Sequence, residues 1–313
     1  LSGFLIGGIL IRDFKKKKTI KVLFNFWIRR WFRTLPNYFL ILIVLILFSS
    51  NTSKEYSYFS YFTFTENFFY PMPDFFPEAW SLSIEEWFYI IVPSSILLLS
   101  YIFKKSSLKS LFLYYSLSII FIFLIIRLER YLHLEIPKGF RTWDLYFNRQ
   151  VITRLDSLMF GVFAVFIKHY YPKVFFYKKK LLFALGLFII VFSQYWIHNT
   201  HNFFIYTIYF SINSVGVVLL IPFLYKLKSC ANNSICKFIS YISLISYSLY
   251  LVNLSLVSGI IIPYINQYYS SPYFNIFLFW GISILISSVL YKYFEIPTTN
   301  LRDKIKAFKN DYR

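Results

Sequence analysis

The sequence predicts an all-α membrane protein, a transmembrane helical bundle of about eight full spans plus a partial N-terminal helix. Of its 313 residues 58% are hydrophobic, and the mean hydropathy is +0.55. The apolar residues form long continuous runs, several of them near the ~20 residues that a helix needs to cross a bilayer. Transmembrane barrels instead show short alternating segments. The lipid bilayer is therefore the first expected partner.

The apolar runs follow one another along the whole chain. Leu1 to Ile11 is apolar and ends at Arg12, which is why we expect the end of a helix there. The eight later runs cover residues 35–50, 80–103, 108–126, 154–167, 181–197, 205–225, 239–262 and 274–292. No repeat or low-complexity linker separates them. We therefore expect one domain over residues 1–313, incomplete at its N-terminus.

The basic residues predict the topology. Most of the 33 lysines and arginines lie in segments 12–33, 104–109, 168–180, 226–237 and 292–313. The positive-inside rule places these segments and the C-terminus in the cytoplasm, and a chain that starts in the cytoplasm then needs one more helix before Leu1. The net charge of +19 is explained by this topology, and no nucleic acid is expected. In the loop with Cys230 and Cys236 we expect neither a disulfide nor a zinc site.

The start of the run at 80–103 is the most informative segment. It reads Trp80-Ser81-Leu82-Ser83-Ile84-Glu85-Glu86-Trp87-Phe88-Tyr89. Ser81, Glu85 and Tyr89 are spaced four apart, so they share one face of a helix. Ionisable groups inside a membrane are costly and usually face a polar cavity, which predicts the wall of a site. A plain helix start near the lipid headgroups, rich in Trp, Tyr and Glu, is the alternative.

Two further groups of charges are candidates. Arg29, Arg30 and Arg33 stand at an expected cytoplasmic helix start, where arginine forks and the helix terminus suit phosphate groups such as those of coenzyme A. Anchoring to anionic lipid is the alternative. Arg154 and Asp156 open another apolar run at a depth similar to Glu85, and they form either a structural ion pair or part of a polar pocket at the outer face.

Several motifs occur in a fixed order along the chain. They are Ser2-Gly3-Phe4-Leu5-Ile6, Arg30-x-x-Arg33 before Leu35-Pro36, Trp80 to Tyr89, Arg154-Leu155-Asp156 with Leu158 and Gly161, Ile245 to Leu251, and Glu295-x-Pro297. In these motifs the chain resembles the acyltransferase-3 family of integral membrane acyltransferases, which includes bacterial O-acetyltransferases of surface polysaccharides. The resemblance runs from Leu1 to about Pro297.

The resemblance implies an activity and a location. Members of that family take an acyl group from acyl-coenzyme A, here expected to be acetyl-coenzyme A, on the cytoplasmic side. They pass it to a hydroxyl of a cell-surface carbohydrate or glycolipid across the bacterial cytoplasmic (inner) membrane, and no metal is expected. The residues implied are Arg29, Arg30 and Arg33 at the donor, Trp80, Phe88 and Asn253 at the substrate, and Ser81, Glu85, Tyr89, Arg154 and Asp156 in catalysis.

Two departures from the family pattern matter. The family's first helix carries an Arg followed eleven residues later by a catalytic His, whereas here the chain begins with the segment of the second helix. Many relatives have His at the position of Asn253, and an amide cannot act as a base. We therefore expect this chain by itself to be inactive or nearly so. A transporter or flippase of lipid-linked or acyl substrates is the alternative function, because buried carboxylates and helix breaks suit it too.

Overall fold

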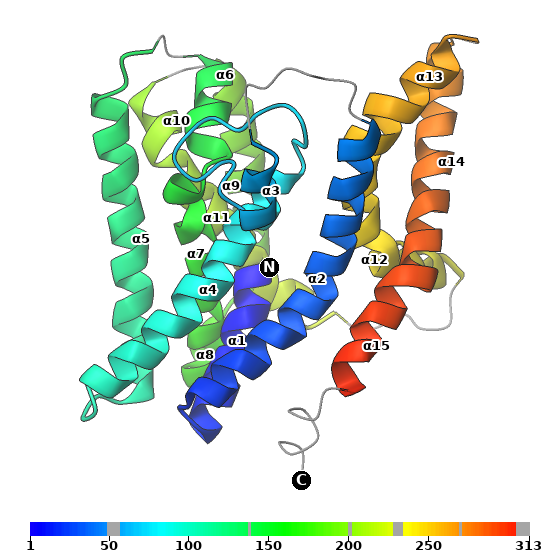
Figure 1. The fold of residues 1–313 in the computed structure, drawn as a ribbon. Helices are drawn as coiled ribbons and strands as arrows, with labels where there is room; N and C mark the ends of the chain where they lie inside the picture. The colour runs from blue at the N-terminus through cyan, green and yellow to red at the C-terminus, as the bar shows by residue number, and fades with distance from the viewer. Residues whose placement is uncertain (49–56, 137–138, 200–201, 228–233, 269–270, 305–313) are drawn as a thin grey trace. The chain divides into compact units, whose positions relative to one another are not determined.

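The computed structural model describes residues 1–48, 57–136, 139–199, 202–227, 234–268 and 271–304 (Figure 1). All regular structure in these ranges is helical, and they contain no strand. The expectation of an all-α fold is confirmed for the described part of the chain. The helices fall into two compact units, which are taken separately below.

The first unit consists of Leu1–Leu23, Asn67–Met72 and Ser83–Lys228. Its elements are α1 (Ser2–Lys16), most of α4 (Ala79–Ile102), α5 (Leu108–Leu132), α6 (Phe140–Trp143), the π-helical η1 (Asp144–Asn148), α7 (Val151–Tyr170), α8 (Pro172–Phe175), α9 (Lys179–Asn199), α10 (Phe203–Thr207) and α11 (Tyr209–Leu224). Within it, α7 packs against α1, α5 and α11, and α11 packs against α9 (Figure 1).

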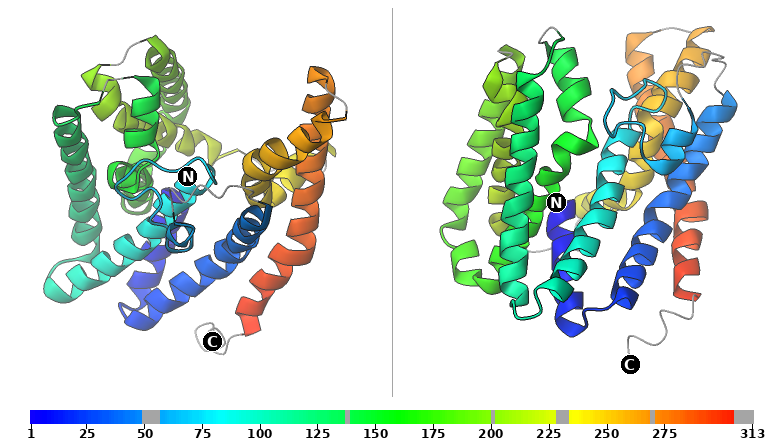
Figure 2. Two further views of the ribbon diagram at one scale, coloured as in Figure 1. Left: turned by 45° about the horizontal axis from the view of Figure 1, so that its top comes forward. Right: turned by 60° about the vertical axis from the view of Figure 1, so that its left-hand side comes forward.

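The second unit consists of Phe24–Glu66, Pro73–Leu82 and Ser229–Arg313. Its elements are most of α2 (Ile20–Phe48), α3 (Phe59–Thr63), α12 (Ser234–Val252), the π-helical η2 (Asn253–Ile261), α13 (Ile262–Asn266), α14 (Pro272–Leu290), the π-helical η3 (Tyr291–Glu295) and α15 (Ile296–Lys304). Figure 2 shows α12 and α14 as neighbours in this unit.

Over its described residues each of the eight predicted apolar runs lies in helix, apart from turn residues at 103, 208 and 225. Among the described residues five helical stretches are long and apolar enough to cross a membrane, and the bent pair of residues 140–148 and 151–170 would make a sixth. The five are Ile20–Phe48, Ala79–Ile102, Leu108–Leu132, Ser234–Asn266 and Pro272–Arg302. The remaining predicted runs are α9, with 21 residues, and the α10–α11 segment, in which α11 has 16. The number of eight spans stays a prediction.

Three local expectations were wrong. Helix α2 begins at Ile20, well before the expected start near residue 35. Helix α5 continues past 126 to Leu132, because the charge of Arg127 is satisfied inside the unit, as shown below. Cys236, near the start of α12, is disulfide-bonded, whereas we expected reduced thiols in that loop; Cys230 lies outside the described residues.

Glycines bring α1 and α7 into direct backbone contact. A Cβ on Gly3 would lie 1.9 Å from the carbonyl oxygen of Leu158, and one on Gly161 would lie 2.6 Å from the amide nitrogen of Phe4. Membrane helices pack closely where small residues meet, since apolar burial gives no preference for protein over lipid. These two glycines therefore hold the helix that carries Ser2 against α7.

We expect Gly161→Ala to lower the unfolding temperature of the purified protein in detergent. The added methyl would force the helices apart at a cost of about 1–3 kcal/mol, typical of overpacking. Gly281→Ala is the matched control, because a Cβ at Gly281 in α14 has no atom within 4 Å. An equal loss of thermal stability in both variants would contradict the proposed helix contact.

Candidate functional site

The carboxylate of Glu85 is held by two hydroxyl groups in the first unit. The Tyr89 hydroxyl donates to Glu85 Oε2 at 2.6 Å, and the Ser2 hydroxyl donates to Oε1 at 2.5 Å. The predicted shared face of Glu85 and Tyr89 on α4 is thus confirmed. Glu85 is half-buried, and Tyr89 is buried beside the ring of Phe88, which has no exposed surface. The charge is therefore oriented from two helices, α1 and α4.

The first turn of α4 makes further contacts within the second unit. The hydroxyls of Ser81 and Tyr250 are hydrogen-bonded at 2.8 Å, and Tyr250 donates to the carbonyl oxygen of Glu78 at 2.6 Å. Trp80 is half-buried beside them. Ser81 is therefore tied to α12, one turn before the carboxylate of Glu85 on the same helix.

Glu78 is a buried carboxylate that we did not predict as a site residue. Its Oε1 accepts the amide hydrogens of Leu254 at 3.1 Å and Ser255 at 2.6 Å, and its Oε2 accepts the Ser255 hydroxyl. Burial raises the pKa of the Glu78 carboxyl, and the hydrogen bonds from Ser255 and Leu254 oppose that rise. The π-helical turn that begins at Asn253 starts here, and π-turns often mark functional positions.

The three candidate donor arginines lie inside α2. Because the helix begins at Ile20, Arg29, Arg30 and Arg33 are not at a helix N-terminus as we expected, and the helix dipole fades beyond the first turn. Arg29 Nε donates to the carbonyl oxygen of Asn25 at 3.2 Å. Arg33 is exposed and interacts electrostatically with Glu295.

A buried polar network lies one turn further along α2. The Asn37 amide donates to Ser248 Oγ and to Glu295 Oε2, both at 3.0 Å, and the Ser248 hydroxyl donates to the same carboxylate oxygen at 2.8 Å. Glu295 belongs to the Glu295-x-Pro297 motif, but sequence reasoning did not predict its partners. An asparagine and a serine inside apolar runs were the available signals.

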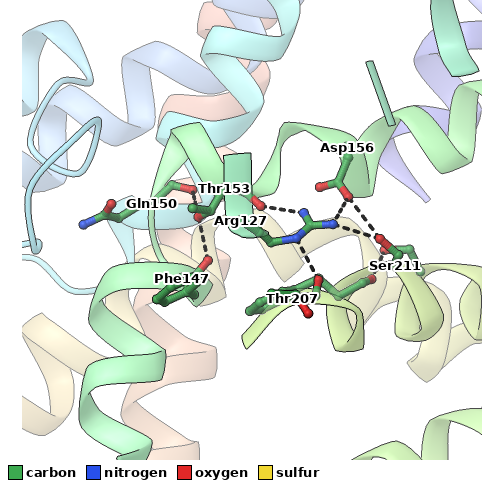
Figure 3. Close-up of polar contacts among 9 residues, drawn as sticks. Arg127, Phe147, Gln150, Thr153, Asp156, Thr207 and Ser211 are labelled. Atoms are coloured by element: carbon green, nitrogen blue, oxygen red, sulfur yellow. Dashed lines mark hydrogen bonds and ion pairs between the residues drawn. The ribbon is translucent and has the colours of Figure 1, made fainter. Parts of the chain in front are cut away.

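Arg127 and Asp156 form an ion pair inside the first unit (Figure 3). Arg127 Nη2 lies 2.8 Å from Asp156 Oδ2, and both side chains are fully buried. Arg127 also donates to the carbonyl oxygens of Thr207 at 2.9 Å and Thr153 at 2.8 Å, and to the Ser211 hydroxyl at 2.8 Å. Asp156 is thus paired with an arginine that we did not predict as a site residue.

Arg154, two residues before Asp156, has a different environment. Its guanidinium carbon lies 4.6 Å from the centroid of the Phe210 ring. Its Nε is buried and has no hydrogen-bond partner in the part of the chain that the structure describes. The sequence predicted either an ion pair or a polar pocket at this position. The ion pair is formed by Arg127, and the buried Nε of Arg154 is left without a hydrogen-bond partner among the described residues.

Within the described ranges no group of three or more His, Cys, Asp or Glu side chains is arranged to hold a metal ion.

Comparison with known proteins gives relatives that include proteins of Staphylococcus aureus. The chain is 28% identical to "Putative O-acetyltransferase SAR0937" of Staphylococcus aureus (strain MRSA252), over 100% of this chain and 53% of that protein. It is 26% identical to "O-acetyltransferase OatA" of Staphylococcus aureus (strain NCTC 8325 / PS 47), over 98% and 52%. The chain therefore spans about half the length of the curated relatives it matches. No family model matches the chain, and no solved structure matches it.

We expect Arg127→Met to destabilise the protein severely, by about 3–5 kcal/mol, because it leaves the Asp156 charge buried without a partner. The double variant Arg127→Met/Asp156→Leu should recover much of the unfolding temperature, since it removes both charges. The pair Arg149–Asp144, at 2.6 Å but partly exposed, is the control: Arg149→Gln should cost at most about 1 kcal/mol. Equal losses in the single and double variants would show that the charge pair is not the cause.

Proposed function

We propose that this chain is the membrane part of an O-acyltransferase. It would move an acyl group, most simply acetyl, from acyl-coenzyme A in the cytoplasm to a hydroxyl of a cell-surface carbohydrate or glycolipid. The observation that carries the proposal is the Glu85 carboxylate, half-buried in a helix of membrane-spanning length and held by Ser2 and Tyr89. The names of the relatives support the acetyl group and the ester product.

The reaction sets the tasks of the site. The acceptor oxygen forms a bond to the thioester carbonyl carbon, the carbon–sulfur bond breaks, and coenzyme A leaves as a thiol that takes up a proton. The acceptor hydroxyl gives its proton to a base, and the carbonyl oxygen needs a donor as its charge develops. The acceptor and the thioester must also be held together.

Glu85 suits a supporting role in that reaction. Both of its oxygens accept hydrogen bonds, so the carboxylate is fixed in place and its charge is balanced by oriented dipoles. Such a group orients a catalytic base and stabilises the positive charge that the base acquires, as the carboxylate of a triad does. In the first unit we assign Tyr89 to holding Glu85 and Phe88 to the substrate. In the second unit we assign Trp80 and Asn253 to the substrate and Ser81 to a catalytic role.

The donor end is assigned to Arg29, Arg30 and Arg33. Guanidinium groups suit the phosphates of coenzyme A, and of the three Arg33 is exposed while Arg29 and Arg30 are half-buried. Glu295, bound to Asn37 and Ser248, interacts electrostatically with Arg33 and so restrains its position. On this assignment α2 binds the donor on the cytoplasmic side. The proposal also places the C-terminus in the cytoplasm and the protein in the bacterial cytoplasmic membrane.

We expect Glu85→Gln to lower the rate of acetyl transfer about a hundredfold, because the amide keeps the shape but loses the charge. The measurement is transfer of radiolabelled acetyl from acetyl-coenzyme A to carbohydrate in proteoliposomes, with the protein expressed from its complete coding region. Glu129→Gln is the control, because Glu129 is an exposed carboxylate on α5, and it should leave the rate within about twofold.

Wild-type rates in Glu85→Gln would remove Glu85 from the reaction. Movement of a lipid-linked substrate across the vesicle membrane without consumption of acetyl-coenzyme A would favour a transporter instead.

We expect Arg33→Gln to raise KM for acetyl-coenzyme A about tenfold with a smaller change in kcat, because one charge-assisted hydrogen bond to a phosphate is lost. The matched control is Lys237→Gln, which removes an exposed positive charge from α12 in the same unit. An unchanged KM in Arg33→Gln, or an equal rise in both variants, would show that Arg33 does not bind the donor.

A further inference from the structure

Three polar side chains at the start of α7 have unused hydrogen-bonding capacity. Gln150, Arg154 and Ser157 are spaced four and three residues apart, so they follow one face of the helix. Gln150 precedes the first turn and is fully buried. Both atoms of its amide, Arg154 Nε and Ser157 Oγ are buried without a hydrogen-bond partner in the described part of the chain. We refer to these three residues as the α7 polar face.

Unpaired buried groups are unusual, and three on one face need a common explanation. Most buried polar side-chain atoms in proteins have a partner, since an unpaired one loses its hydration without compensation. The neighbouring Thr153 is paired, since it donates to the carbonyl oxygen of Phe147 at 2.7 Å. Asp156 is paired with Arg127 through Oδ2, but its Oδ1 is also buried without a hydrogen-bond partner among the described residues. In Figure 3 the Gln150 amide points away from the Arg127 group. The open capacity of Gln150, Arg154 and Ser157 thus lies outside the contacts that Arg127 makes.

The charges near this face do not balance. Among the described residues, Arg154 interacts electrostatically with the cation of Arg127, with the Asp156 carboxylate and with the Tyr209 hydroxyl. The Oδ2 atom of Asp156 is already 2.8 Å from Arg127. Contact with the Phe210 ring stabilises the Arg154 guanidinium only in part. A buried cation is normally matched by an anion, and here the Asp156 carboxylate acts on two guanidinium groups.

We propose that the α7 polar face binds an acidic sugar, with Arg154 on its carboxylate or phosphate and with Gln150 and Ser157 on its hydroxyls. An amide and a hydroxyl both donate and accept hydrogen bonds, which matches the hydroxyl groups of a carbohydrate. The guanidinium matches an anion. The inference rests on the proposed function, in which this sugar is the acceptor, and it narrows that acceptor to an anionic class.

The test compares ligands that differ in one group. Wild-type protein in nanodiscs is titrated with para-nitrophenyl glucuronide and with para-nitrophenyl glucoside, which has a hydroxymethyl group in place of the carboxylate, and binding is followed by ligand-observed NMR. The glucuronide should bind at least about tenfold more tightly, the effect of one charge-assisted hydrogen bond. Glucose phosphate, titrated against glucose, distinguishes a phosphate from a carboxylate as the preferred anion.

Two variants locate the effect. Arg154→Gln should abolish the preference for the charged sugar. Gln150→Glu should also abolish it, because a carboxylate four residues before Arg154 supplies the missing charge, and it should raise the unfolding temperature. A folded Gln150→Glu variant keeps the proposal testable if Arg154→Gln does not fold. Arg141→Gln, an exposed arginine on α6, should retain the preference.

Equal binding of the two glycosides by wild-type protein, or an unchanged preference in folded Gln150→Glu, would overturn the inference. Its failure is separable from that of the proposed function. Acetyl transfer by a protein that binds charged and neutral sugars equally would contradict only the inference that the acceptor is acidic. Anion preference that depends on Arg154 without any acetyl transfer would leave a sugar-binding membrane protein and remove the enzyme.

Discussion

The first unit depends on a guanidinium that has no contact with water. Arg127 on α5 pairs with Asp156 on α7 and donates to Thr153, Thr207 and Ser211, so one side chain joins α5, α7, α10 and α11. A charge moved from water into an apolar interior costs several kcal/mol unless it is paired and hydrogen-bonded. The four helices are therefore held in the arrangement that pairs and hydrogen-bonds this charge, and this fixes the position of α7 in the unit.

Helix α7 also carries Arg154, an arginine whose hydrogen-bonding capacity is not fully used. Arg127 is satisfied by its partners, whereas Arg154 has a ring beneath it and a buried Nε with no partner within the described residues. Since the two guanidinium groups lie close enough to interact, the difference between them is not one of depth or residue type. It separates a charge that holds helices together from the charge to which we assign a ligand.

Carboxylates in the second unit hold irregular helix. Glu78 binds the amide hydrogens of Leu254 and Ser255, where the backbone changes from α-helical to π-helical. Glu295 ends a π-helical turn and is held by Asn37 and Ser248. A π-turn leaves amides outside the regular helix pattern, and backbone groups in an apolar environment must be paired. These acids thus stabilise breaks near the residues assigned to the substrate and the donor.

The sequence by itself determined the all-α class, the helical runs and the shared face of Glu85 and Tyr89, because hydropathy and helical spacing are local properties. It misplaced the ends of α2 and α5, where charged residues continue a helix that local rules would stop. Only the tertiary structure decided that Asp156 pairs with Arg127, that Glu78 holds the turn at Asn253, and that Arg154 Nε is buried without a hydrogen-bond partner among the described residues. Those outcomes depend on which distant helices become neighbours, and no spacing along one helix encodes that choice.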